Sequence, residues 1–466
     1  MDEAAVEERL EVAVRGPDGH IAPDFLAAIT AALEAGDGDR LAEIVEPVHE
    51  ADLADIIEAL KGDQRRQFVE LLGPRFDFRT LTEVDDTVRE EILDLLPTKA
   101  VVEGISDLDT DDAVYILEDL DEGEQKEILA QIPAAERAPL QRSLEYPEDS
   151  AGRRMQSEYI AVPPYWTVGQ TIDHMRDSDD LPNEFYEIFI VDPAFRPIGT
   201  VSLNHLLRAK RPVKMEEIME REIYTVKASA DQEEVARTFE RYDLVSAAVI
   251  DDSERLVGVI TVDNIIDVIE EEADEDIRLL GGVGDEEISD SVLTTTRSRF
   301  VWLLVNLGTA ILASWVISLF DTTITQMVAL AVLMPIVASM GGNAGTQTMT
   351  VVVRALATGD LAHFNVGRVV TRETLVGFLN GCLFAVIMGV VAALWFANPQ
   401  LGGVIGVAMV LNMLAAGIFG IIIPLGLHRL KLDPAVASGP FVTTVTDVVG
   451  FFVFLGLGAW WFGLAW

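Results

Sequence analysis

The sequence predicts a multi-domain membrane protein, with an α-helical, superhelical N domain and a tandem α/β pair ahead of a five-helix transmembrane domain. Three observations predict this class. Charge is divided unevenly along the chain, a strand-and-helix pattern occurs twice near the middle, and long apolar runs fill the last third. We expect boundaries at residues 1–150, 151–262, 263–296 and 297–466, the third segment being an acidic connecting helix and linker.

The charge distribution separates an acidic part from an apolar part. Residues 1–296 hold 72 of the 77 acidic and 27 of the 34 basic residues, a net charge of 27 − 72 = −45. The remaining 170 residues hold 5 acidic and 7 basic residues, a net of +2. Such a field argues against nucleic acid and anionic lipid as partners, and it concentrates cations. An acidic surface with only seven lysines also suits a high-salt habitat, and the two interpretations are compatible.

Short apolar-periodic blocks between about Leu41 and Leu140 predict the N domain, and the first 40 or so residues are expected to be flexible. Pro97, Pro133 and Gly73-Pro74 separate these blocks. Blocks this short bury their apolar faces only by stacking, which indicates a superhelical array of helix pairs. The polar, acidic N-terminus excludes a signal peptide, so this part is expected in the cytosol.

An internal repeat follows between about Met155 and Glu270. Phe189-Ile190-Val191-Asp192 and the nearby Gly-containing run Pro197 to Ser202 recur 59 positions later, ending at Thr261. Each copy has a helical stretch before and after it, which predicts a paired α/β module. The acidic helical pattern from Asp263 to Asp276 comes next, and a divalent cation between its carboxylates and others would turn repulsion into attraction.

The membrane half divides into five spans, roughly 300–320, 325–353, 369–396, 402–427 and 436–464. All its basic residues fall on one side of that arrangement: Arg297, Arg299, Arg354, Arg368, Arg372, Arg429 and Lys431. The positive-inside rule therefore predicts a cytosolic N-terminus and an external C-terminus in a cell (inner or plasma) membrane. The single cysteine, Cys382, lies in an apolar run and allows no internal disulfide.

The second and fifth spans carry the candidate pore residues. In the second, Gly341-Gly342-Asn343-Ala344-Gly345-Thr346-Gln347 places two amides, Asn343 and Gln347, one turn apart. In the fifth, Asp447 lies about 18 Å from Ala435, near the middle of a bilayer core ~30 Å thick. An intramembrane carboxylate faces protein or water, and oxygen ligands there suit a hard cation. Further candidates for lining the path are Gly439, Pro440, Thr443 and Thr444.

The repeated module resembles a tandem pair of cystathionine-β-synthase (CBS) domains. The chain as a whole resembles the MgtE family of magnesium channels or transporters over almost everything past residue 40. The most specific marks are Gly341 to Gln347, Arg354 to Ala357, Asp433-Pro434 with Ser438-Gly439-Pro440 and Asp447, and Tyr146 to Arg153. No Walker loop and no nucleophile–base grouping stands out, so we expect no enzyme.

The resemblance implies a homodimer in a lipid bilayer, with one Mg²⁺ pore lined by the second and fifth spans and Asp447 as its metal-binding residue. It also implies feedback, in which intracellular Mg²⁺ between the N domain, CBS pair and connecting ("plug") helix closes the pore. The matching regulatory positions are Asp107, Asp111, Gly152, Glu233, Asp243, Asp263, Asp267, Glu275 and Asp276.

The chain departs from the family pattern at two places. Asn264 stands where the family commonly has a second aspartate after Asp263, which weakens or removes one regulatory ligand. Asn204-His205 stands where nucleotide-binding members have Arg-Asp, so the carboxylate that would hold a ribose is missing and ATP binding is doubtful. Two alternatives to a Mg²⁺ channel stay open, a Na⁺- or H⁺-coupled divalent cation exchanger and a membrane-anchored CBS sensor that transports nothing.

Overall fold

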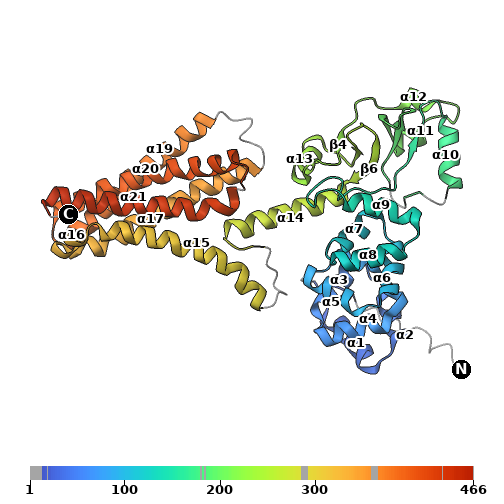
Figure 1. The fold of residues 1–466 in the computed structure, drawn as a ribbon, viewed down its shortest axis with the longest axis horizontal. Coiled ribbons are helices and arrows are strands. Elements are labelled where there is room, and N and C mark those ends of the chain that lie inside the picture. The colour runs from blue at the N-terminus through green and yellow to red at the C-terminus, as the bar shows by residue number, and fades with distance from the viewer. Residues whose placement is uncertain are drawn as a thin grey trace. The chain divides into compact units, whose positions relative to one another are not determined.

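The computed structural model describes residues 13–17, 19–178, 181–182, 185–284, 292–357, 366–432 and 434–464. The chain forms two compact units, Met1–Glu271 and Glu272–Trp466, each described by itself (Figure 1). The predicted acidic N-terminus (residues 1–8), the residues that follow the second span (358–360) and Asp433 lie outside the described residues.

The first unit begins with a stack of short helices (Figure 1). Its α-helices are α1 (Pro23–Ala35), α2 (Gly38–Val45), α3 (Glu50–Ala59), α4 (Gly62–Leu72), α5 (Asp86–Leu95), α6 (Thr98–Ser106), α7 (Thr110–Glu118), α8 (Glu122–Gln131) and α9 (Ala134–Leu144), with 3₁₀ turns η1 (Gly73–Arg75) and η2 (Phe78–Thr82). This arrangement confirms the helical N domain.

Capping and burial explain these short elements. The Asp37 carboxylate accepts a hydrogen bond from the Arg40 backbone N–H at the start of α2, and Pro97 and Pro133 are the N-cap residues of α6 and α9. One apolar core runs through the whole stack and includes Ile29 of α1 and Val114 of α7, both fully buried. The helical part therefore begins at α1, before the first block that the sequence pattern marked.

The rest of the first unit is the duplicated α/β module, which confirms the CBS pair. Its elements are β1 (Ala161–Val162), α10 (Val168–Asp177), β2 (Glu187–Val191), β3 (Pro197–Ser202), α11 (Leu203–Arg208), α12 (Met215–Ile218), β4 (Thr225–Lys227), α13 (Gln232–Tyr242), β5 (Ser246–Ile250) and β6 (Leu256–Thr261). In each copy the first strand pairs parallel to the second, and the second pairs antiparallel to the third. The parallel strands β1 and β4 are additions to the predicted pattern.

The two copies share a buried core. Phe189 and Val191 of β2 pack in one cluster with Ala248 of β5 and with Leu256 and Val259 of β6. Between the copies, Ser246 Oγ donates a hydrogen bond of 3.0 Å to Glu187 Oε2. The helix α14 (Val262–Leu280) follows β6 directly, and its Ile265 and Val268 are buried against the second copy.

The second unit is a bundle of long apolar helices (Figure 1). Its described helices are α15 (Val292–Ser318), α16 (Asp321–Gln326), α17 (Val328–Ala357), α19 (Val366–Trp395), α20 (Pro399–Arg429) and α21 (Pro434–Phe462). All except the short α16 are long and apolar enough to cross a membrane, which agrees with the five predicted spans.

The helix α20 lies at the centre of this unit. It packs against α17, α19 and α21, while α17 also packs against α21, and α15 contacts α21. Small residues permit the close approach of these helices, because a Cβ at Gly377 of α19 would lie 2.7 Å from the Met413 carbonyl of α20. The outer faces are apolar, as at Trp315 of α15, which is 59% exposed and suits contact with lipid.

Candidate functional site

The two amides predicted to line a pore lie on one exposed face of α17. Asn343 and Gln347 are both exposed, four residues apart on a continuous helix. The opposite side of the glycine segment is packed: a Cβ at Gly345 would lie 2.7 Å from a Val442 methyl group of α21. The glycines therefore serve close helix packing and do not unwind α17.

The helix α21 presents Thr443 as exposed and Asp447, one turn further, as half-buried. Thr443 Oγ1 donates to the Gly439 carbonyl at 3.0 Å, and Thr444 Oγ1 donates to the Pro440 carbonyl. The helix continues through Gly439-Pro440, and these two carbonyls accept their hydrogen bonds from side chains of the same helix. The described residues hold no cluster of three or more His, Cys, Asp or Glu side chains suited to a metal ion.

A second candidate site is an acidic cleft of about 460 Å³ in the first unit, between the N domain, the entrance of the CBS pair and the start of α14. Four predicted regulatory residues line it: Asp107, Asp111, Asp263 and Asp267. Acidic residues that were not predicted also line it: Glu50, Glu83, Asp109, Asp112, Glu118 and Glu271. The structure thus brings together carboxylates from four separate stretches of the chain, around residues 50, 83, 107–118 and 263–271.

Burial and mutual repulsion raise the pKa values of two carboxyl groups in this cleft. Burial raises the pKa of Asp112, and the neighbouring carboxylates of Asp109 and Asp263 raise it further. Burial also raises the pKa of Glu83, with Asp267 adding to the shift. A cation that lies between two such carboxylates stabilises both of them, because attraction to the cation replaces their mutual repulsion.

Asp111 and Asn264 form a direct link between α7 and α14. Asn264 Nδ2 donates a 2.8 Å hydrogen bond to Asp111 Oδ2, and Thr261 Oγ1 donates one of 2.9 Å to Asn264 Oδ1. Asp111 is buried, which raises its pKa. The Asn264 amide therefore contacts Asp111 as a neutral hydrogen-bond donor, at a place where a second carboxylate would repel it.

Two arginines at the CBS entrance, Arg153 and Arg154, were not among the predicted site residues. Arg154 Nη2 lies 2.7 Å from Glu271 Oε2, and its Nη1 lies 3.9 Å from Glu118 Oε1. Arg153 Nε lies 3.7 Å from Glu118 Oε2. Burial raises the pKa of Glu118 to about 7, although both arginines act to lower it. The cleft therefore contains built-in cations beside its carboxylates.

The other predicted regulatory residues lie outside this cleft. Gly152 precedes the two arginines, and its backbone N–H donates to the Ala228 carbonyl at 2.8 Å. Glu233 accepts a 2.5 Å hydrogen bond from Arg237 in α13, and Asp243 ends that helix with a φ of +52°. Glu275 and Asp276 lie on the part of α14 that belongs to the second unit.

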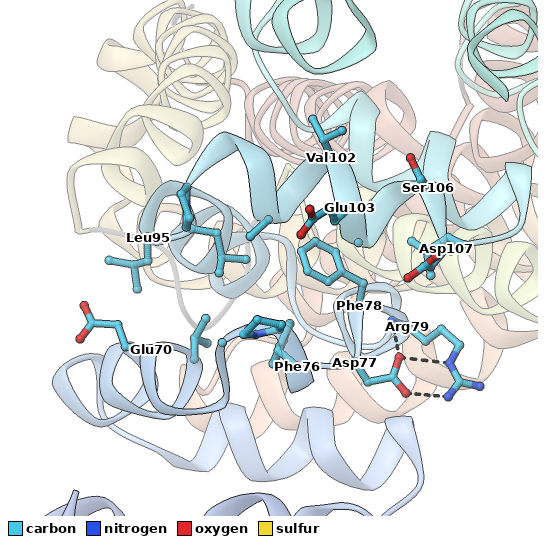
Figure 2. A pocket seen from close by; sticks show the side chains of 18 of the residues that line it. Glu70, Phe76, Asp77, Phe78, Arg79, Leu95, Val102, Glu103, Ser106 and Asp107 are labelled. Atoms are coloured by element: carbon cyan, nitrogen blue, oxygen red, sulfur yellow. Dashed lines mark hydrogen bonds and ion pairs between the residues drawn. The ribbon is translucent and has the colours of Figure 1, made fainter. Parts of the chain in front are cut away.

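Another pocket, with a volume of about 890 Å³, lies within the N domain and is different in character (Figure 2). Phe76, Phe78, Leu95 and Val102 contribute apolar surface, and Asp107 lies at its edge. A mostly apolar lining offers few ligands to a hydrated ion. This pocket therefore does not serve as the candidate ion site.

Asn204 of the first CBS copy is engaged locally. Its Oδ1 accepts hydrogen bonds from Ser202 Oγ at 2.5 Å and from the His205 backbone N–H at 2.7 Å.

The fold and these sites define a multi-pass membrane protein with an acidic helical domain and a CBS pair. Family models match in the same order: MgtE intracellular N domain at residues 48–149, CBS domain at 151–211 and 215–271, and divalent cation transporter, MgtE, at 334–457. The chain belongs to the MgtE family of magnesium transporters, which is not an enzyme class.

Named relatives extend over most of the chain. It is 33% identical over 435 residues to the magnesium transporter MgtE of Thermus thermophilus, covering 91% of this chain and 96% of that protein. It is 29% identical over 415 residues to the magnesium transporter MgtE of Bacillus subtilis, covering 89% and 92%. A crystal structure of the cytosolic domain of the Mg²⁺ channel MgtE in complex with ATP is similar at 31% identity, covering 52% of this chain and 99% of that one, with a TM-score of 0.49.

Proposed function

We propose that this protein is a Mg²⁺-selective channel that carries Mg²⁺ into the cytosol down its electrochemical gradient, and that intracellular Mg²⁺ closes it. Membership of the magnesium transporter family supports the ion. The observation that carries the proposal is Asp447, a carboxylate within a membrane-spanning helix, one turn from the exposed Thr443. An acid in such a position is costly unless it faces protein or a water-filled path.

The path is formed by two copies of the chain. Asn343, Gln347 and Thr443 are exposed within one copy, so its own helices leave these polar groups uncovered. In a homodimer the α17 and α21 faces of both copies enclose one pore, and the two Asp447 carboxylates meet a Mg²⁺ ion that keeps most of its water. Selectivity then depends on the size and charge of the hydrated ion.

The direction of flux follows from voltage and orientation. The seven basic residues of the membrane half lie on one side of the five spans, which supports a cytosolic N-terminus and an external C-terminus. At ~100 mV, inside negative, a divalent cation gains about 4.6 kcal/mol on entry.

The acidic cleft is the Mg²⁺ sensor in this proposal. Mg²⁺ bound among Asp107, Asp111, Asp263 and Asp267 joins the N domain to α14, and Glu275 and Asp276 extend the sensor along that helix. Gly152, Glu233 and Asp243 belong to further regulatory sites. The working boundaries are residues 1–150 for the N domain, 151–262 for the CBS pair, 263–296 for the connecting helix and linker, and 297–466 for the pore.

Uptake of Mg²⁺ into proteoliposomes under an inside-negative potential tests the pore. We expect uptake by the unmodified protein, its loss in Asp447→Ala, and its retention in Asp321→Asn, which removes another acid of the membrane half. Equal uptake in the first two proteins would move the ion site away from Asp447.

Two further measurements test gating and mechanism. Deletion of residues 1–270 should leave uptake intact and remove its inhibition by Mg²⁺ on the cytosolic side; persistent inhibition would refute the sensor. Flux that follows an imposed Na⁺ or proton gradient at constant voltage would replace the channel with an exchanger.

A further inference from the structure

A buried amide joins the three central helices of the membrane unit. Asn412 of α20 is fully buried, and its Nδ2 donates a 2.8 Å hydrogen bond to the Val337 carbonyl of α17. Within the described part of the chain, its Oδ1 has no hydrogen-bond partner. A buried polar group with an unmet acceptor costs free energy, so apolar packing alone does not account for an amide here.

Two glycines make the space that this side chain occupies. A Cβ added to Gly341 of α17 would overlap the Asn412 amide nitrogen, and one added to Gly450 of α21 would lie 2.8 Å from it. Contacts this short do not occur without displacement of one partner. The side chain of Asn412 therefore sets how closely α17 and α21 can approach α20.

The same level of the bundle carries the proposed pore residues. Gly341 precedes Asn343 by two residues, and Gly450 follows Asp447 by three, which are offsets of about 3 Å and 4.5 Å along the helix axes. Asn343 is exposed whereas Gly341 is buried. The Asn412 amide therefore contacts the buried side of α17, away from the face that carries Asn343. A shift at this contact moves the helices that carry both pore residues.

We propose that Asn412 is a positioning residue for ion permeation, which fixes the separation and rotation of α17 and α21 so that Asn343 and Asp447 face one path. It acts through its contacts with Val337, Gly341 and Gly450. This inference rests on the proposed function in one respect, the assignment of α17 and α21 to the pore.

The first test replaces the amide with an apolar side chain of similar size. Asn412→Leu removes the hydrogen bond to Val337, and we expect Mg²⁺ uptake per amount of folded, reconstituted protein to fall about tenfold. The ratio of Mg²⁺ to Mn²⁺ uptake should change as well, which a purely structural role would not cause. Asn380→Leu, at a half-buried asparagine of α19, is the matched control and should leave both values unchanged.

The second test uses the glycine contact and does not depend on how well Asn412→Leu folds. Gly341→Ala should reduce uptake because its Cβ overlaps the amide, and the double variant Gly341→Ala/Asn412→Ala should recover part of that loss because the overlap is removed. Unchanged uptake and ion ratio in Asn412→Leu, or additive losses in the double variant, would overturn the inference. Absence of uptake by the unmodified protein would instead refute the proposed function, and the inference with it.

Discussion

Two arginines in and beside the acidic cleft, Arg154 and Arg89, contact Tyr115 and place positive charge among the carboxylates. The Arg154 guanidinium lies 5.3 Å from the Tyr115 ring centroid, and the guanidinium of buried Arg89 lies 4.4 Å from the same ring. Arg89 also pairs with Asp119 at 2.5 Å. These fixed cations offset part of the repulsion between the carboxylates around the cleft.

Glu118 makes the stability of the first unit depend on pH. Its pKa is raised to about 7 in the folded state, because burial favours the protonated form. The folded state therefore binds this proton more tightly than the unfolded state, so the stabilisation is complete at low pH and is lost as pH rises through 7. The free energy of unfolding of the unmodified 1–271 fragment should fall between pH 5 and pH 7. This fall should be about 2 kcal/mol greater than that of the same fragment with Glu118→Gln.

Urea unfolding at several pH values, without Mg²⁺, measures this difference. Glu122→Gln is the control, since Glu122 is exposed and pairs with Lys126 of its own helix. Parallel pH profiles for the unmodified fragment and Glu118→Gln would show that Glu118 ionises normally.

At the level of elements, the contact between α6 and η2 shapes the N domain. Figure 2 shows the Phe78 ring directed toward α6, where a Cβ at Gly104 would overlap it. Gly104→Ala should therefore displace the ring or the helix and lower the free energy of unfolding by about 1–3 kcal/mol. Gly123→Ala in α8, where a Cβ meets no atom within 4 Å, should instead be neutral or stabilising by up to about 1 kcal/mol.

Thermal and urea unfolding of both variants in the 1–271 fragment test this prediction. Equal stability of the two variants would mean that Phe78 moves aside at no cost.

Elements with long periodic patterns were predictable from the sequence, and short ones were not. The repeat predicted both central strand pairs because apolar runs and glycines recur at one spacing. The strands β1 and β4 have two and three residues, too few for an alternating pattern to be recognised. The helix α16 was missed for the same reason, since its six residues, polar and apolar, resemble a loop.

The candidate site was predictable only in part, because tertiary contact decides it. Family resemblance pointed to Asp107, Asp111, Asp263 and Asp267, which the structure brings to one cleft. No local sequence pattern marks Glu118 or Arg154 as site residues. They are 36 positions apart in the sequence and lie close together only in the folded chain. Arg154 also pairs with Glu271, which is 117 positions further along the sequence. Likewise, Asn412 is an isolated amide in an apolar run, and only the glycines of two other helices give it a role.

For the whole molecule, the imbalance of charge predicts a strong dependence on salt. Residues 1–296 have a net charge of −45, which repels itself in the folded state. Raising KCl from 0.05 M to 1 M shortens the screening length from more than 10 Å to about 3 Å. The unfolding temperature of the 1–271 fragment should then rise by at least about 5 °C.

Differential scanning calorimetry in KCl, with an equal osmolality of sucrose as control, measures this rise. MgCl₂ at millimolar concentration should produce a similar rise at far lower ionic strength if ions bind in the acidic cleft. Equal effects of MgCl₂ and KCl at matched ionic strength would indicate screening alone.

The shared core of the two CBS copies has a consequence for how this region folds. Strands of both copies contribute to one cluster, and the Phe195 carbonyl of the first accepts a 2.9 Å hydrogen bond from the Leu256 backbone N–H of the second. Neither copy can lose its structure without exposing apolar surface of the other. The duplicated halves therefore melt as one cooperative unit, and a protease that cuts between them would release no independently folded half.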